Sequence, residues 1–181
     1  MKAPRLLLLS ACLLLPSLAF AWGAWHSYRR HFHRRSAYHT VFPLRDALPN
    51  ARLTPGALNP AVTQSDLYRT ICVRGYTRRI RPPEPYTERL KRRQIRTYRY
   101  PDHWLRDYEE DHLIPLELGG SPTSPRNLWP EPHYVVGGWG SYRKDRLENR
   151  LNHLVCRGQL SLAAARRMIA ANWIAAYRRY R

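Results

Sequence analysis

The C-terminal part of the chain has the clearest pattern of hydrophobic and polar positions. Apolar residues recur at spacings of three and four between Leu147 and Val155, and again between Leu162 and Ala176. This spacing is typical of one buried face of an α-helix. Ser141 and Ser161 are candidate N-caps, and Gly158 is a candidate stop between them. The pattern predicts two consecutive amphipathic helices.

A second pattern, with a period of two, occurs in the middle of the chain. One face would carry His112, Ile114, Leu116 and Leu118, and the other Leu113, Pro115 and Glu117. Residues 111–118 alternate between two faces and predict a strand, which Pro115 restricts to a sheet edge or a twisted ribbon. The glycines and prolines of 119–125 predict a turn. Residues 127–129 would then form the returning strand, ended by the prolines that follow. The middle of the chain is therefore expected to be a β-hairpin.

The segment before the hairpin is less regular. Prolines and glycines between residues 41 and 63 favour an extended path around the domain. Residues 66–70 can form one helical turn, and residues 70–73 look like a short strand. Thr87 can cap a helix that runs through Ile95. Together with the hairpin and the C-terminal helices, these elements predict the α+β class.

The N-terminus has the organisation of an export signal. Lys2 and Arg5 precede an apolar run of about 15 residues, which is short of the roughly 20 that a membrane span requires. Ala19-Phe20-Ala21 has the small-x-small pattern of a cleavage site. We therefore predict a signal peptide over 1–21. An uncleaved anchor is one alternative, and a lipoprotein processed and lipidated at Cys12 is another.

Residues 22–40 are rich in arginine, histidine and aromatic residues and show no helical or strand period. This composition favours a basic arm without stable structure. Its histidines could bind a transition metal, which is the alternative interpretation. The remaining residues, 41–181, have a length typical of one compact domain.

The net charge of +18 changes the range of expected partners. Loss of the signal peptide lowers it only to +16, because the two basic residues near the N-terminus are removed with no acidic residue. A positive field of this size attracts polyanions, nucleic acid first and acidic envelope surfaces second. Charge alone says nothing about catalysis.

The cysteines agree with export. If Cys12 is removed with the signal peptide, Cys72 and Cys156 remain, and an even pair in an exported chain favours a disulfide. A bridge over about 85 residues would stabilise the fold by roughly 4 kcal/mol in the chain-entropy model. Two buried thiols are the alternative. No Cys-x-x-Cys occurs, which argues against zinc ribbons and thioredoxin-like sites.

Three residues of the predicted hairpin are candidates for a catalytic centre. Asp111 and His112 are adjacent at one strand entrance, and the returning strand would bring Asn127 alongside them. Carboxylate and amide oxygens suit hard divalent cations. A neutral imidazole can take a proton from water near pH 7. The order therefore predicts a hydrolytic centre with a metal ion, provided that Asp111 lies at an irregular mouth of the ribbon, since neighbours in a regular strand point to opposite faces.

These residues resemble the HNH (His-Asn-His) endonuclease superfamily. The words that carry the resemblance are Asp-His-Leu-Ile-Pro-Leu-Glu-Leu-Gly-Gly over 111–120 and Asn-Leu-Trp-Pro-Glu-Pro over 127–132, which look like small exported bacterial members. The flanks, Thr70-Ile71-Cys72-Val73, Arg81-Pro82-Pro83 and Lys144-Asp145-Arg146-Leu147-Glu148, are similar too, so the resemblance covers about residues 50–181.

The resemblance implies a ββα-metal (His-Me finger) core, made of a hairpin and a helix, that binds one divalent metal ion. Mg²⁺ is the first expectation, with Mn²⁺, Ni²⁺ and Zn²⁺ as alternatives. The implied activity is hydrolysis of phosphodiester bonds in DNA, with RNA as the alternative. His112 would be the general base, Asp111 a metal ligand, and Asn127 either a ligand or the residue that orients the catalytic loop.

The chain departs from the family pattern at the third residue of the His-Asn-His motif. A His or Asn is usual about nine residues after the central Asn, and Val136 stands there. We assign Glu148 as the substitute metal ligand, with Asp145 next and His133 as a weaker candidate. A missing third ligand implies either two protein ligands with water or a site that no longer cuts.

Phosphate contacts are expected from five basic residues. Guanidinium groups pair well with phosphate oxygens, and several of these residues flank the motif in sequence. They are Arg92, Arg93, Arg126, Arg143 and Lys144. No recognition helix or zinc finger is visible, so binding should have low sequence specificity. Glu109 and Glu110 are expected to be a solvated pair, with assistance to the metal ion as the alternative.

The leading hypothesis is therefore a metal-dependent, monomeric endonuclease that a bacterium exports to its periplasm or secretes. No stable membrane partner is expected unless Cys12 is lipidated. The main rival is a non-catalytic protein that binds nucleic acid or the cell envelope and keeps the hairpin only as a framework. A metal-sequestering protein that uses the histidine-rich arm is a third hypothesis.

Overall fold

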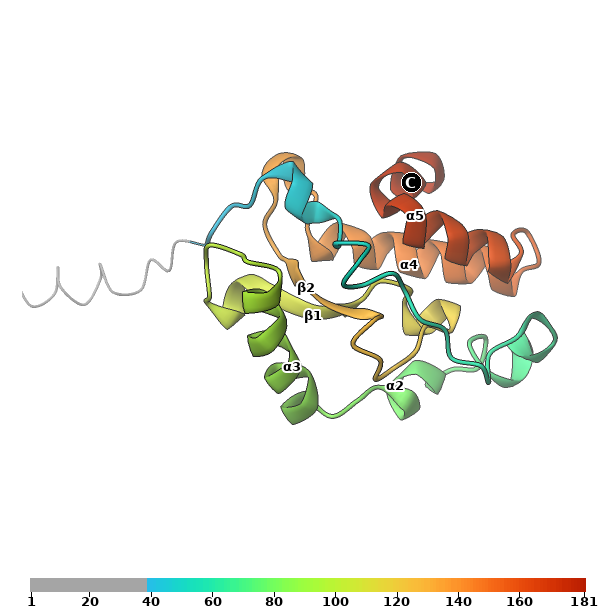
Figure 1. Cartoon of the computed structure of the whole chain (residues 1–181). Coiled ribbons are helices and arrows are strands. Elements are labelled where there is room, and N and C mark those ends of the chain that lie inside the picture. The colour runs from blue at the N-terminus through green and yellow to red at the C-terminus, as the bar shows by residue number, and fades with distance from the viewer. Residues whose placement is uncertain (1–38) are drawn as a thin grey trace, which may run out of the picture. The chain divides into compact units, whose positions relative to one another are not determined.

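The computed structural model describes residues 39–181 (Figure 1). The predicted signal peptide, and the predicted arm up to residue 38, lie outside the described residues. The compact unit begins at His39, two residues before the expected start of the domain. His39 belongs to it because its Nδ1 atom lies 2.9 Å from Oδ1 of the buried Asp107.

The sheet of the described region is an antiparallel hairpin of two strands, β1 (Tyr108–His112) and β2 (Leu128–Pro132). The class is α+β, as predicted. Strand β1 starts three residues earlier than expected and ends at His112, so the prediction of a strand over 111–118 is wrong. Residues 116–118 form a 3-10 turn instead, because Pro115 has no amide hydrogen with which to continue the ladder.

Strand β2 also differs from its predicted bounds. Pro130 and Pro132 lie inside the strand, opposite Glu110 and Tyr108, and do not end it. A proline is tolerated there because each strand of a two-stranded ribbon has one unpaired edge. The prediction that β1 is an edge strand or part of a ribbon is confirmed within the described residues.

Helix α3 (Glu84–Thr97) packs against both strands, and the short helix α2 (Tyr76–Ile80) precedes it. The helix starts three residues before the predicted cap Thr87, because Pro85 is compatible with a first turn. The strand predicted over 70–73 is absent. A 3-10 helix over Gln64–Arg69 is followed by turns in which the amides of Thr70 and Cys72 both donate to the Leu67 carbonyl.

Helices α4 (Ser141–Cys156) and α5 (Leu162–Tyr180) end the chain, as predicted, but α5 is kinked at Asn172, where the backbone is extended (φ −167°, ψ 96°) and not helical. Ser161 caps α5, since its hydroxyl accepts from the amide of Ala164 at 3.2 Å. Ser141 is not the cap of α4. Gly140 occupies the N-cap position, and the Ser141 hydroxyl bonds Nδ1 of His133 at 2.7 Å instead.

The core lies where α4 and α5 pack on each other and on the loop that follows β1. Leu147, Leu151 and Val155 of α4 and Ile169 and Trp173 of α5 are buried, as the two apolar stripes predict. Figure 1 shows the hairpin between α3 on one side and the α4–α5 pair on the other. The hairpin therefore has a different helical neighbour on each face.

A disulfide joins Cys72 to Cys156, with a sequence separation of 84 and a Cα–Cα distance of 5.7 Å. The predicted bridge is confirmed. It ties the turns after the 3-10 helix to the last residue of α4. None of the helices within residues 39–181 is long and apolar enough to cross a membrane.

Candidate functional site

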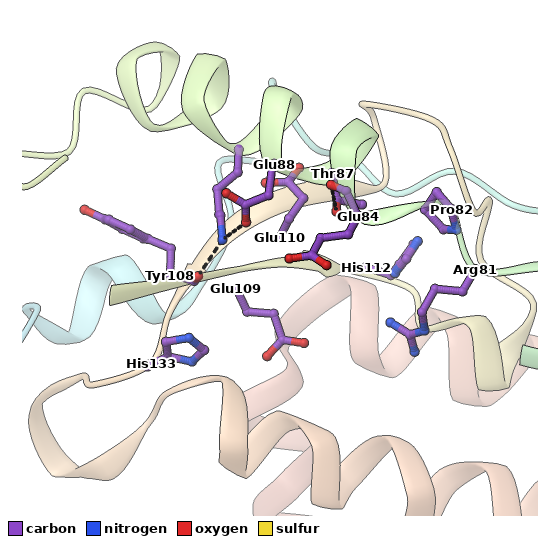
Figure 2. Close-up of a pocket in the computed structure, with 11 residues that line it drawn as sticks. Arg81, Pro82, Glu84, Thr87, Glu88, Tyr108, Glu109, Glu110, His112 and His133 are labelled. Carbon is purple, nitrogen blue, oxygen red and sulfur yellow. Dashed lines mark hydrogen bonds and ion pairs between the residues drawn. The ribbon is translucent and has the colours of Figure 1, made fainter. Parts of the chain in front are cut away.

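A pocket of about 440 Å³ opens between β1 and the first half of α3 (Figure 2). Its walls carry four glutamates, two histidines and two cations. The charged and histidine residues are Arg81, Glu84, Glu88, Lys91, Glu109, Glu110, His112 and His133. His112, the predicted general base, is the member at the C-terminal end of β1.

The imidazole of His112 is oriented by the hairpin loop. Its Nε2 lies 3.0 Å from the carbonyl oxygen of Pro122. Because a carbonyl only accepts, Nε2 carries the proton and Nδ1 keeps the lone pair of a base. Only 3% of the residue is exposed, and this burial lowers the pKa of His112, although the bond to Pro122 opposes the effect. The imidazole is therefore neutral at pH 7.

Arg81 lies beside this imidazole in the pocket (Figure 2). It follows the last residue of α2, and its positive charge also contributes to the low pKa of His112. In the sequence, Arg81 belongs to the segment that carries the resemblance, and the resemblance implies no role for it. The signal available there was an arginine held just before two prolines, which fix the backbone on its C-terminal side.

Asn127 holds the loop between the strands. Its Nδ2 donates to the carbonyls of Ile114 and Ser121 at 2.9 and 3.0 Å. Its Oδ1 accepts from the amides of Ile114 and Ala57 at 3.0 and 3.4 Å. The amide group thus has both of its donor hydrogens and both oxygen lone pairs engaged by backbone. Of the two roles that the resemblance implies, this geometry favours loop orientation over metal binding.

Gly120 lies against the hydrogen bonds that Asn127 makes with the loop. A Cβ atom there would lie 1.7 Å from the Ile114 carbonyl oxygen and 2.7 Å from Nδ2 of Asn127. The second glycine of the motif is therefore required by a close backbone approach. This approach shapes the loop that presents the Pro122 carbonyl to His112.

Asp111 faces away from the His112 pocket. It pairs with Trp129 inside the regular ladder, so the expectation that it lies at an irregular mouth is wrong. Neighbours in a regular strand point to opposite faces. His112 accordingly lines the pocket beside α3, whereas the Asp111 carboxylate bonds Lys144 of α4.

Lys144 is fully buried at the centre of a cluster of carboxyl groups. Its Nζ donates to Oδ2 of Asp111, to Oε1 of Glu148 and, at 2.8 Å, to the carbonyl of His112. These acceptors satisfy all three N–H groups of the ammonium. Burial alone would lower the pKa of Lys144, but the neighbouring carboxylates outweigh it and keep the amine charged.

Glu131 completes the cluster and was not identified from the sequence. It is fully buried beside Asp111 and Lys144. Burial raises the pKa of Glu131 well above its usual value, with Lys144 opposing the effect. Burial also acts on Asp111, but there the Lys144 ammonium prevails and the pKa is lowered. Asp111 is therefore the ionised partner, and Glu131 is neutral.

The predicted metal ligands Asp111 and Glu148 do converge, but on Lys144. Within residues 39–181 no group of three or more His, Cys, Asp or Glu side chains is arranged to hold a metal ion. Burial raises the pKa of Glu148 well above its usual value, with Lys144 opposing the effect. Because the ammonium lies between the Asp111 and Glu148 carboxyl groups, the residues in this arrangement do not fit the predicted divalent ion. Metal dependence stays a prediction.

Glu109 and Glu110 are not the solvated pair that was expected. Glu110 points from β1 toward α3, and Glu109 points to the other side (Figure 2). Desolvation raises the pKa of Glu109 to about 7 and that of Glu110 to about 9. Both carboxyl oxygens of Glu110 are buried without a partner among the described residues. Both side chains are half-buried, because the elements that pack on the two faces of β1, which the sequence does not reveal, partly cover them.

The five predicted phosphate contacts do not gather around the pocket. Arg93 and Arg126 line a different hollow of about 340 Å³ beside the C-terminal half of α3, and Arg92 is exposed on the same helix. The guanidinium of Arg143 lies 4.5 Å from the centre of the Trp139 ring. Lys144 has no free donor, so we leave it out of the proposed contacts. The cations at the pocket itself are Arg81 and Lys91.

Comparisons with known proteins add no information about this site. No family model, no curated protein and no solved structure matches the chain.

Proposed function

We propose that this chain is an endonuclease that hydrolyses phosphodiester bonds, in DNA first and RNA as the alternative. The observation that carries the proposal is the His112 imidazole, held by the Pro122 carbonyl in the tautomer of a base, beside Arg81 and in an open pocket. The net charge of +18 supports a polyanionic substrate.

In the proposed reaction, Nδ1 of His112 takes a proton from a water molecule as the water oxygen bonds to phosphorus. The bond between phosphorus and the leaving oxygen breaks, and the leaving oxygen takes a proton from solvent. Arg81 stabilises the charge that develops on the phosphate oxygens. Asn127 acts through the loop that it holds, and is a positioning residue.

The test is degradation of plasmid DNA by the purified protein with Mg²⁺, with Mn²⁺ or with chelator. His112→Ala should lose cutting and keep binding, because the base is removed and the surface charge is not. His153→Ala, an exposed histidine of α4, is the matched control and should cut normally. The chelator arm tests the predicted metal dependence separately. Wild-type protein that only shifts the DNA under every condition would refute the endonuclease.

One rival is favoured by a specific observation. Lys144 fills the space between the predicted metal ligands, as it would in a protein that keeps the hairpin only as a framework. Such an exported protein would bind nucleic acid or the cell envelope without cutting. In that case wild type and His112→Ala would behave identically in the plasmid assay.

We infer export to an oxidising compartment from the disulfide, because such bonds are rare in reducing cytoplasm. Cell fractionation combined with non-reducing electrophoresis tests this inference. Oxidised protein outside the cytoplasm is expected, and a reduced cytoplasmic protein would contradict it.

A further inference from the structure

An exposed aromatic pair borders the His112 pocket. His133 lines that pocket, and its ring stacks on Tyr142 with 5.0 Å between centroids and 14° between planes. Tyr142 is in the first turn of α4 and is 52% exposed, so its ring is accessible from solvent. Tyr134 supports it edge-on, at 6.2 Å between centroids.

Arginines continue this surface along α4. Arg146 and Arg150 follow Tyr142 at successive spacings of four, so they lie on the same side of the helix, and both are exposed. Glu109 and Asp145 are the acidic neighbours of Tyr142. We call the surface formed by His133, Tyr142, Arg146 and Arg150 the aromatic–arginine track.

The track ends in another hollow, which lies between α4 and α5 and is separate from the hollow beside α3. Its volume is about 240 Å³, and its lining combines arginine and tyrosine: Arg146, Leu147, Arg150, Tyr177, Tyr180 and Arg181. Two aromatic rings at the His112 pocket are thus followed by two arginines along α4, and the hollow adds two tyrosines and a third arginine.

We propose that the aromatic–arginine track binds single-stranded nucleic acid and leads it into the His112 pocket. Bases stack on exposed rings with little regard to sequence, and arginines pair with the phosphates between them. A duplex cannot use Tyr142 in this way because its base faces are already stacked on one another. The charge of the chain is complementary to such a polyanion. The proposal rests on the proposed function for the role of the pocket, but its binding component is measurable without cleavage.

The test measures affinity in the full protein carrying His112→Ala, in the presence of chelator, so that the probe stays intact. The probes are a fluorescent single strand of about 12 nucleotides, within the usual range of site sizes, and the duplex of the same sequence. Tyr142→Ala should weaken single-strand binding about tenfold and change duplex binding by less than about twofold. Tyr142→Phe keeps the ring and should bind as the parent does.

Tyr68→Ala is the matched control, because Tyr68 is 72% exposed on the 3-10 helix before Cys72. It should leave both affinities unchanged. Equal loss for single strand and duplex in Tyr142→Ala, or no loss, overturns the proposal. So does an equal loss of binding to vesicles of anionic phospholipid, which would assign the track to a membrane surface.

Two further measurements keep the outcomes separate. If Tyr142→Ala does not fold, as judged by its thermal melt, Tyr142→Leu keeps the apolar bulk without the ring and carries the same expectations. Cleavage by the protein with His112 intact is measured independently. A chain that prefers single strands through Tyr142 but never cuts supports the track and refutes the endonuclease. A chain that cuts but binds equally well without the ring refutes the track alone.

Discussion

The two faces of strand β1 have opposite characters, although the residues that define them are adjacent. His112 lies in an open pocket, held by one backbone carbonyl, with a nitrogen lone pair left for chemistry. Asp111 lies in a closed cluster in which every donor of Lys144 is used. The comparison teaches that a two-residue motif can supply a reactive group on one side of a strand and a structural ion pair on the other.

Removing the cation of the closed face should have the largest effect on stability. Lys144→Met leaves the ionised Asp111 buried without its partner, and breaking a buried pair in this way costs about 3–5 kcal/mol. Urea denaturation measures the loss. Arg150→Met, on the exposed side of the same helix, should cost little. A loss below about 1 kcal/mol in Lys144→Met would show that the cluster is not a structural ion pair, and Asp111→Asn in the Lys144→Met background should recover part of the stability.

Removing Arg81, one of the two cations of the open face, should affect the cleavage rate and leave the free energy of unfolding nearly unchanged. Arg81→Ala should lower the cleavage rate about 10²–10³-fold, which is the usual effect of losing a donor that stabilises transition-state charge. Single-turnover cleavage, with a thermal melt in parallel, checks the separation. Arg78→Ala, an exposed arginine of α2, is the control. If both variants cut equally well, Arg81 has no part in the reaction.

The titration of Glu110 shows how strongly the open face of β1 is shielded from water. A raised pKa means that its contribution to stability is fully present below the unfolded value of 4.5 and is lost as pH rises toward about 9. Glu110→Gln cannot ionise, so it should be more stable than wild type by about 3 kcal/mol at pH 7 and equal to it near pH 4. Urea denaturation at both pH values measures this. A constant difference between the two would contradict the assigned burial.

The smallest expected effect is in the pH profile of cleavage. Because burial lowers the pKa of His112, the acid limb of kcat/KM should lie below pH 6.5, the usual value for histidine. For stability the sign is unfavourable in acid, since the folded state binds this proton less tightly and a penalty develops as pH falls below 6.5. The limb should move up in Arg81→Ala and stay in place in His153→Ala. A limb above 6.5 in wild type would contradict the neutral base.

Local regularities predicted much of the fold. The apolar stripes of α4 and α5, the Ser161 cap and the pairing of Cys72 with Cys156 were all readable, because each depends on spacing along one helix or on the parity of cysteines. The strand bounds were not readable. Alternation over 111–118 does occur, but Pro115 interrupts the ladder, and pairing with β2 selected 108–112 instead.

For the candidate site, the sequence by itself determined which groups are available: the Asp-His pair, the Asn that follows the loop, and the lysine and glutamate of α4. Only the tertiary structure decided which of these groups lie on the α3 side of β1 and which lie on the α4 side. The pleat of β1 sends Asp111 toward α4 and His112 toward α3, and burial without water then requires the Asp111 carboxylate to find Lys144. The physical reason is that reactivity depends on which side of a strand a group faces and what covers it, and both follow from contacts between segments far apart in the chain.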